Sequence, residues 1–200
     1  MKNLNNKKVA ILATNGFEES ELFEPKDALE KAGANVHVVS LETGSIKAWN
    51  HGDWSKSITV DSTLDDAKTD DYDMLILPGG VINPDKLRRE EKAVDFVRSF
   101  FHKDKLVAVI CHGSQTMIEA KVVKGRKMTS FFSIKTDLIN AGAHWIDDAV
   151  VIDNNLISSR NPGDLQNFNA KIIEMLQKSG DINWDKTPIK ENTLSSKREQ

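Results

Sequence analysis

A single cysteine, Cys111, is the residue of this sequence best suited to covalent chemistry. It stands in LVAVICHGSQTM (residues 106–117), where an apolar run meets a polar, helix-prone segment. A nucleophile between a strand and a helix is lifted out of the sheet by a sharp turn. The helix N-terminus favours a thiolate, and the N–H groups of His112 and Gly113 would point beside the sulfur. The alternative is a buried structural thiol, because free cysteines are often buried; the position before HGS favours the nucleophile.

Two other segments carry groups that would assist such a sulfur. Gly79 and Gly80 follow the apolar run LIL, and glycines let backbone N–H groups approach a ligand closely enough to form an oxyanion hole. Pro-Gly-Gly can equally be a plain turn. Glu18 and Glu19 lie in TNGFEES, and a protonated carboxyl beside the sulfur would stabilise the thiolate and lower the pKa of the thiol. Otherwise these are solvated loop acids.

Three further residues have a catalytic and a structural interpretation. His112 is a candidate general base, but adjacent side chains usually diverge, so it reaches the sulfur only across a strained turn or acts through its own partner. Asp85 is one acid that could orient it, or it is a favourable charge at a helix N-terminus. Arg160 could bind a substrate carboxylate, but we favour an internal ion pair with Asp164 or another acid.

Short apolar runs alternate with longer amphipathic segments. We expect strands over residues 7–13, 34–42, 73–80, 106–110 and 126–131, and a hairpin over 149–159. We expect helices ending near Gly33, over 62–72, over 83–104 with Asn83 as its N-cap, over 113–120, over 133–142 and over 161–176. Residues 44–61 suggest an antiparallel excursion at a sheet edge. The fully apolar strands predict an α/β sandwich around a mostly parallel sheet.

That architecture predicts where a ligand binds. In open α/β sheets, ligands bind beyond the carboxyl ends of the strands. The loops TNGFEES, PGGVINPD and CHGSQ all leave strands at this edge, so the fold would gather them into one crevice.

Composition excludes several classes of function. The chain has 200 residues and a net charge of −3, which gives no electrostatic case for nucleic acid. No apolar run is long enough for a membrane span, no secretory segment is visible, and one cysteine suggests the reducing cytoplasm. Histidines lack metal-ligand spacing and no phosphate loop occurs, so we expect no metal or cofactor. We expect one domain over 1–178 and a polar tail over 179–200.

Several motifs together resemble the PfpI family, the intracellular cysteine peptidases and protein deglycases of the class I glutamine amidotransferase-like superfamily. The matching pieces are NGFEESEL, DMLILPGG with NPDKLR, AVICHGSQTMIEAKVVKGRKMTS, NAGAHWID and LISSRNPGDLQNF. The resemblance implies a flavodoxin-like three-layer sandwich, a Cys111 nucleophile and no cofactor. It also implies that Glu18 is the acid that contacts the cysteine and that His112 is the histidine that directly follows the cysteine. Asp85 falls where peptidases carry an acid that reaches a neighbouring subunit's histidine, so we expect a homodimer or higher oligomer.

The preferred function is a cofactor-independent cysteine hydrolase acting on glyoxal or methylglyoxal adducts in stress protection. The catalytic residues would be Cys111, His112, Glu18 and Asp85. The oxyanion and the substrate would contact a second set of residues, Gly79, Gly80, Gly113 and Arg160. The alternatives are an intracellular cysteine peptidase acting on peptides and a non-catalytic redox-sensing or chaperone-like stress protein.

Overall fold

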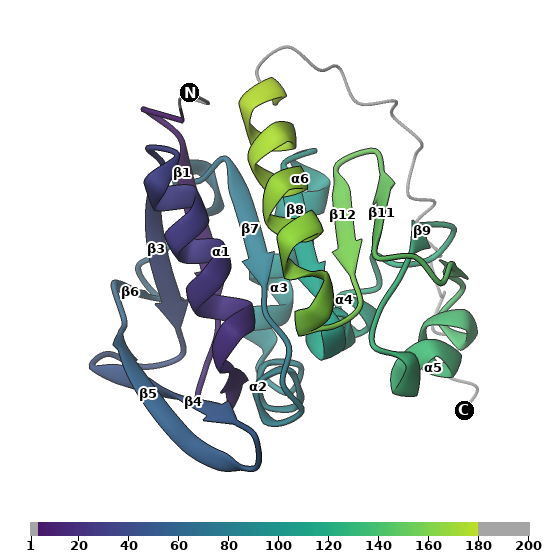
Figure 1. Ribbon diagram of the computed structural model, residues 1–200, viewed down its shortest axis with the longest axis horizontal. Coiled ribbons are helices and arrows are strands. Elements are labelled where there is room, and N and C mark those ends of the chain that lie inside the picture. Colours follow the sequence, from purple (N-terminus) through teal and green to yellow (C-terminus); the bar gives the residue numbers. More distant parts are fainter. Residues whose placement is uncertain (1–3, 180–200) are drawn as a thin grey trace, which may run out of the picture.

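A seven-stranded sheet forms the centre of the protein. The computed structural model describes residues 4–179, and the sheet has the order β11-β12-β8-β7-β1-β3-β6 (Figure 1). All neighbouring strands pair in parallel except β11 and β12, which form an antiparallel hairpin. The strands are β1 (Lys8–Leu12), β3 (Asn35–Ser40), β6 (Ser62–Thr63), β7 (Met74–Leu77), β8 (Leu106–Ile110), β11 (Val150–Asp153) and β12 (Leu156–Ser159). The predicted mostly parallel α/β sandwich is confirmed.

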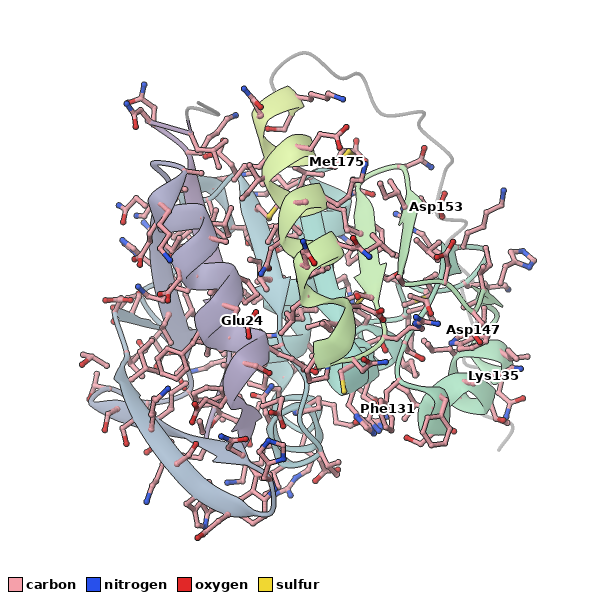
Figure 2. The ribbon with its side chains drawn as sticks, viewed as in Figure 1. Glu24, Phe131, Lys135, Asp147, Asp153 and Met175 are labelled. Atoms are coloured by element: carbon pink, nitrogen blue, oxygen red, sulfur yellow. The ribbon has the colours of Figure 1, made fainter. Side chains whose placement is uncertain are left out.

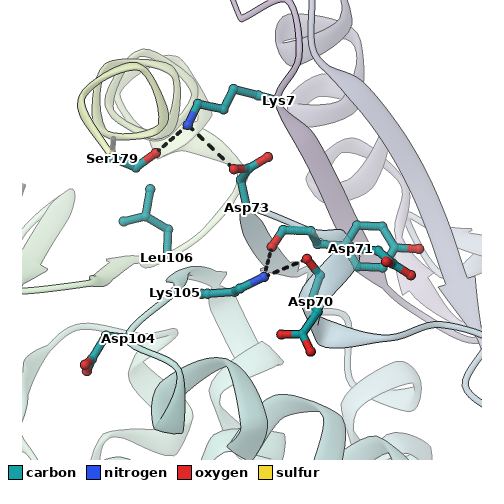
Figure 3. A pocket seen from close by; sticks show the side chains of 9 residues that line it. Lys7, Asp70, Asp71, Asp73, Asp104, Lys105, Leu106 and Ser179 are labelled. Atoms are coloured by element: carbon teal, nitrogen blue, oxygen red, sulfur yellow. Dashed lines mark hydrogen bonds and ion pairs between the residues drawn. The ribbon is translucent and has the colours of Figure 1, made fainter. Parts of the chain in front are cut away.

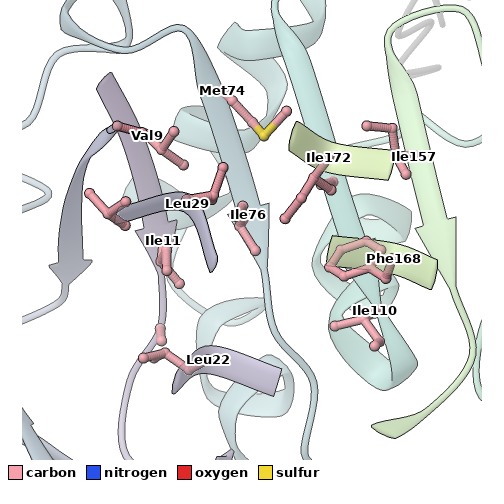
Figure 4. Close-up of a cluster of buried hydrophobic side chains, with 14 of the residues drawn as sticks. Val9, Ile11, Leu22, Leu29, Met74, Ile76, Ile110, Ile157, Phe168 and Ile172 are labelled. Atoms are coloured by element: carbon pink, nitrogen blue, oxygen red, sulfur yellow. The ribbon is translucent and has the colours of Figure 1, made fainter. Parts of the chain in front are cut away.

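Helices cover both faces of this sheet. α1 (Glu19–Lys31) and α6 (Leu165–Lys178) pack on one face, seen in front in Figure 1 and in close-up in Figure 4. α3 (Glu91–His102) and α4 (Ser114–Glu119) pack on the other. Successive residues of a strand alternate between faces, so Val9 and Ile11 join the first cluster while Ala10 and Leu12 join the second. Burial on both faces explains why the strands are apolar throughout.

Two small sheets flank the main one. β4 (Ser45–Asn50) and β5 (Asp53–Thr59) form the expected antiparallel hairpin, but it joins β2 (Phe17–Glu18) in a separate sheet and not the edge of the main sheet. β9 (Lys127–Met128) pairs with β10 (His144–Trp145). The hairpin therefore attaches to the segment that enters α1, next to the crevice predicted for the site.

Two predicted helices were wrong. Residues 62–72 form β6 and a short 3-10 turn, η1 (Thr69–Asp71). The helix expected over 83–104 is divided into α2 (Ile82–Leu87) and α3, because Glu90 takes an extended conformation between them. The intervening segment RRE (residues 88–90) has no apolar side chain to hold a continuous stripe against the sheet. Asn83 is not an N-cap, because its buried side chain bonds other loops.

The remaining short helices follow β8, β9 and β12 along the chain. They are η2 (Cys111–Gly113), η3 (Phe132–Ile134), α5 (Lys135–Asn140) and η4 (Pro162–Asp164). The expected helix stop at Gly33 is confirmed by its positive φ of 100°. Within residues 4–179, no helix has the length and apolar character needed to cross a bilayer. The predicted tail, apart from Ser179, lies outside the described residues, so the domain boundary stays a prediction.

Candidate functional site

Cys111 occupies a strained turn at the carboxyl end of β8. It begins η2 and has a φ of 60°, a left-handed conformation that is uncommon for a residue with a side chain. Such strain concentrates at functional sites, where the surrounding structure over-determines it. The side chain is largely buried, with 7% of the residue exposed. The predicted strand–turn–helix setting is therefore present, although the sulfur is less accessible than expected.

The strained turn brings His112 back to the sulfur. His112 Nδ1 lies 3.2 Å from Cys111 Sγ, although the two residues are adjacent in sequence. The other ring nitrogen, Nε2, lies 3.0 Å from Ser133 Oγ. The ring stacks on Phe131, with centroids 4.9 Å apart. Burial lowers the pKa of His112, so the imidazole is neutral at pH 7.

Asp85 does not orient His112 within the chain. Asp85 lies exposed on α2. The group beside the His112 ring nitrogen, where we expected an acid, is the Ser133 hydroxyl. Ser133 was missed because it follows β9 in a segment that sequence patterns placed at the start of a helix. A role for Asp85 across a subunit interface stays a prediction.

The Pro-Gly-Gly turn after β7 packs directly against the cysteine. Gly80 has a φ of 76°, and a Cβ there would lie 2.6 Å from Gly16 O. This leaves no space for a side chain. In this turn the Gly80 N–H is directed at the sulfur, and the His112 N–H also donates to it. Gly80 and His112 thus provide a pair of donors for developing negative charge, as expected for the glycine turn.

Gly79 and Gly113 have roles other than those predicted. The Gly79 N–H donates to Glu21 Oε2 at 2.8 Å, so it is not free to bind an oxyanion. A Cβ on Gly113 would lie 2.4 Å from Leu77 O, which shows that this glycine allows η2 to pack against the end of β7. The donors that face the sulfur are therefore those of Gly80 and His112.

The acid beside the cysteine is Glu21, and the assignment of this contact to Glu18 was wrong. Glu21 has no exposed surface, and its carboxyl hydrogen-bonds the Cys111 thiol. Both groups flank Gly79, where an added Cβ would lie 2.7 Å from Glu21 Oε2 and 2.7 Å from Cys111 Cβ. Glu21 Oε1 has no hydrogen-bond partner among residues 4–179.

Glu18 lies one helical turn earlier, at the entrance to α1. It is the last residue of β2, half-buried, and burial raises the pKa of its carboxyl while His51 lowers it. A signal in the sequence could have separated the two acids. The buried face of α1 is formed by Leu22, Pro25 and Leu29, and Glu21 continues this stripe toward the sheet edge.

Burial strongly perturbs the proton affinities of the pair. Desolvation raises the pKa of Glu21 to about 8. Burial, followed by the charge of Glu21, raises the pKa of the Cys111 thiol, whereas the N–H groups of His112 and Gly80 lower it. The expected low thiol pKa is therefore corrected, because desolvation outweighs the helix N-terminus. Both pKa values thus lie above 7, so the resting pair is a protonated carboxyl beside a neutral thiol. The sulfur becomes a thiolate only when its proton moves to a neighbouring base, such as His112.

Arg160 forms the internal ion pairs favoured by the sequence. Its Nε and Nη2 donate to the two oxygens of Asp164 at 2.9 and 3.1 Å, and Nη1 donates to Asp147 at 2.8 Å. The guanidinium is thereby held at the start of α6. This arrangement favours the structural interpretation over substrate binding.

Asn83 ties two of the site's loops together. Its Oδ1 accepts from the Thr14 N–H at 2.8 Å, and its Nδ2 donates to Pro78 O at 2.9 Å and Gly79 O at 3.2 Å. The loop after β1 and the glycine turn after β7 are thus held by one buried amide. The predicted gathering of distant loops at the carboxyl edge is confirmed.

A cavity of about 270 Å³ lies at the opposite edge of the sheet (Figure 3). Its lining is charged, but Lys105 Nζ is occupied by the carbonyl oxygens of Thr69 and Tyr72, and Lys7 by Ser179 and Asp73. The groups hold the ends of strands and helices together and do not converge on a reactive side chain. Among residues 4–179, no group of three or more His, Cys, Asp and Glu could hold a metal ion.

Comparison with known proteins identifies relatives over most of the chain. The model of the DJ-1/PfpI family matches residues 7–175. The chain is 44% identical over 170 residues to the Deglycase PfpI of Pyrococcus furiosus, covering 85% of this chain and 99% of that protein. An uncharacterised protein of Staphylococcus aureus is 43% identical over 173 residues, covering 86% of this chain and 99% of the relative.

Solved structures agree with this relationship. Drosophila melanogaster DJ-1beta is 32% identical and superposes with a TM-score of 0.78, covering 86% of this chain and 90% of that chain. A two-domain protein of Anabaena variabilis, with DJ-1/ThiJ/PfpI-like and ferritin-like domains, is 38% identical with a TM-score of 0.81, covering 89% of this chain. This chain spans 50% of that protein. The neighbours confirm the flavodoxin-like fold.

The deglycase-named relative supports a PfpI-type, hydrolase-like function. Three of the motifs that suggested the PfpI family, NGFEESEL, DMLILPGG and the CHGS segment, lie together around Cys111, and the family model covers both the sheet and the site. This chain belongs to the DJ-1/PfpI family.

Proposed function

We propose that this protein is a cofactor-independent cysteine hydrolase that removes glyoxal or methylglyoxal adducts from amines and thiols. The observation that carries the proposal is the single sulfur held in a strained turn between Glu21 and His112, with the Gly80 and His112 N–H groups directed at it. A buried acid, a neutral imidazole and two backbone donors are the groups that nucleophilic catalysis by a thiol requires.

The reaction is balanced without an external oxidant. For a methylglyoxal adduct on an amine, the Cys111 sulfur bonds to the carbinol carbon as the carbon–nitrogen bond breaks, and the amine leaves with a proton. A proton then moves from this carbon to the neighbouring carbonyl carbon through an enediol. The first carbon is thereby oxidised to a thioester and the second is reduced to an alcohol. Water cleaves the thioester, which releases lactate and restores the thiol.

The residues around the sulfur match these steps. Glu21, which holds its proton at pH 7 beside the sulfur, is placed to donate the proton that the leaving amine takes. His112 Nδ1 lies within reach of the sulfur and its substituent, so it is placed for the transfer between carbons. The N–H groups of Gly80 and His112 would stabilise the oxyanion formed when water attacks the thioester.

We expect lactate formation from a methylglyoxal–amine adduct to fall by roughly 10⁴-fold or more in Cys111→Ala, because the covalent intermediate cannot form. Lactate is the product to measure, since these adducts also decay reversibly, and that decay releases methylglyoxal and not lactate. Val109→Ala is the matched control, because Val109 is buried on the same strand but faces the other core cluster.

Equal lactate rates in wild type and Cys111→Ala would remove the proposal. Thiol-dependent cleavage of fluorogenic peptides without lactate formation would favour the peptidase alternative. Selective oxidation of Cys111 by mild peroxide, with neither activity, would favour the redox-sensing alternative.

A further inference from the structure

We propose that Ser133 is a positioning residue that holds His112 in the ring orientation needed at Cys111. Its Oγ lies 3.0 Å from His112 Nε2, while His112 Nδ1 lies 3.2 Å from Cys111 Sγ. The three side chains form a line from the nucleophile through the imidazole to a hydroxyl. The proposal rests on the proposed function, because it names the group that orients the histidine used there.

The stacking partner alone cannot fix the ring. His112 packs on Phe131 at an interplanar angle of 29°, and Phe131 lies at the end of the molecule where β7 and β8 finish (Figure 2). A half-turn of the imidazole about its bond to Cβ leaves the ring in the same plane and preserves the stack. That half-turn exchanges Nδ1 for a carbon opposite the sulfur. Ser133 distinguishes the two orientations, because only one of them presents Nε2 to its hydroxyl.

A hydroxyl is suited to a histidine that moves protons. A neutral imidazole has one donor and one acceptor nitrogen, and a serine can match either of them. When Nδ1–H donates to the thiolate, the Ser133 hydroxyl donates to Nε2. When Nδ1 accepts a proton from the sulfur or substrate and Nε2–H is present, Ser133 Oγ accepts from it. A carboxylate at this position would instead favour the charged imidazolium.

The location of Ser133 makes it testable with little risk to the fold. It lies exposed in η3, which follows β9, and Phe131 at the start of this segment is held by a hydrogen bond from its N–H to Cys111 O at 3.3 Å. The backbone contact keeps the segment in place when the serine side chain changes. Thr136, exposed one helical turn later on α5, is the matched control for loss of a hydroxyl.

The test is the rate of Cys111 alkylation by iodoacetamide from pH 5 to 10, for wild type, Ser133→Ala, Ser133→Thr and Thr136→Ala. We expect Ser133→Ala to slow alkylation at pH 7 by about threefold to tenfold, the effect of losing one hydrogen bond. Its rate–pH profile should move to higher pH. Ser133→Thr and Thr136→Ala should remain within about twofold of wild type. Nuclear Overhauser contacts from the ring protons of His112 should report one ring orientation in wild type and two in Ser133→Ala.

Each outcome decides the proposal separately from the deglycase activity, because alkylation needs no substrate. An unchanged alkylation profile in Ser133→Ala would overturn the positioning role even if lactate formation were observed. A loss that Ser133→Thr fails to restore, or that Thr136→Ala reproduces, would overturn it as well. A shifted and rescued profile without lactate formation would support positioning while removing the proposed function. Where turnover is observed, Ser133→Ala should lower kcat with little change in KM.

Discussion

Glu21→Gln is expected to stabilise the folded protein increasingly as the pH rises from about 5 to 8, while it lowers turnover by roughly 10²-fold or more. The carboxyl of Glu21 is fully buried next to Cys111, and burial raises its pKa from an ordinary value of 4.5 to about 8. Between these values the folded protein binds a proton that the unfolded chain has released. Folding therefore becomes less favourable as the pH increases across this window.

The amide of the Glu21→Gln variant removes this dependence. It keeps an oxygen for the Gly79 N–H, which in the wild type donates to Glu21 Oε2, and it has no charge to desolvate. Each pH unit in the window corresponds to about 1.4 kcal/mol, so the gain in unfolding free energy above pH 8 has an upper limit of about 5 kcal/mol. Turnover falls because an amide cannot release and recover the proton that the leaving group needs.

Denaturant unfolding of wild type and Glu21→Gln at pH 5, 6, 7 and 8 would measure the effect. Glu24→Gln is the matched control, because Glu24 lies exposed on the same helix (Figure 2). The difference between wild type and Glu21→Gln should grow with pH, whereas the control should run parallel to wild type. Parallel curves for Glu21→Gln would show that the buried carboxyl does not take up a proton when the protein folds.

Asn83→Ala is expected to destabilise the fold by about 3 kcal/mol or more and to slow alkylation of Cys111. The amide makes hydrogen bonds to Thr14 N–H, Pro78 O and Gly79 O, and it is fully buried. Removing it leaves the Thr14 N–H without its acceptor in the interior, which alone costs about 1–3 kcal/mol. The glycine turn also loses its hydrogen-bonded link to the loop after β1, so the Gly80 N–H is held less rigidly toward the sulfur.

Urea unfolding and iodoacetamide alkylation at pH 7 would test both parts. Asn140→Ala is the control, because Asn140 lies exposed at the end of α5. If Asn83→Ala unfolded at the same urea concentration as wild type, the Asn83 side chain would contribute nothing to the free energy of unfolding. If stability fell but alkylation did not change, the glycine turn would hold its shape without this tether.

The alternation of buried strands and amphipathic helices was readable from local patterns. Runs such as LVAVI and MLIL are apolar at every position because both faces of a parallel sheet are covered, and the structure contains them as β8 and β7. The continuous helix expected over 83–104 failed at Glu90, where the backbone turns between α2 and α3. Periodicity indicates a buried face but does not show where the chain must bend to reach it.

The position of the candidate nucleophile also followed from order along the chain, since Cys111 directly follows a strand and precedes a helix. The residues that contact the sulfur could not be identified from this order. Glu18 and Glu21 are one helical turn apart, and the direction of α1 against the sheet decides which carboxyl meets Cys111. Ser133 reaches His112 from a segment 21 residues further along the chain.

The sequence by itself determined the sheet, the edge at which its loops gather and the cysteine at their centre, because these depend on local hydrophobic pattern and on the general rule for parallel sheets. Only the tertiary structure decided that Glu21 is the acid beside the cysteine, that Gly80 and His112 supply the donors, and that Ser133 faces the histidine. These contacts join segments that are separate in sequence, and their energies depend on burial, which no local pattern records.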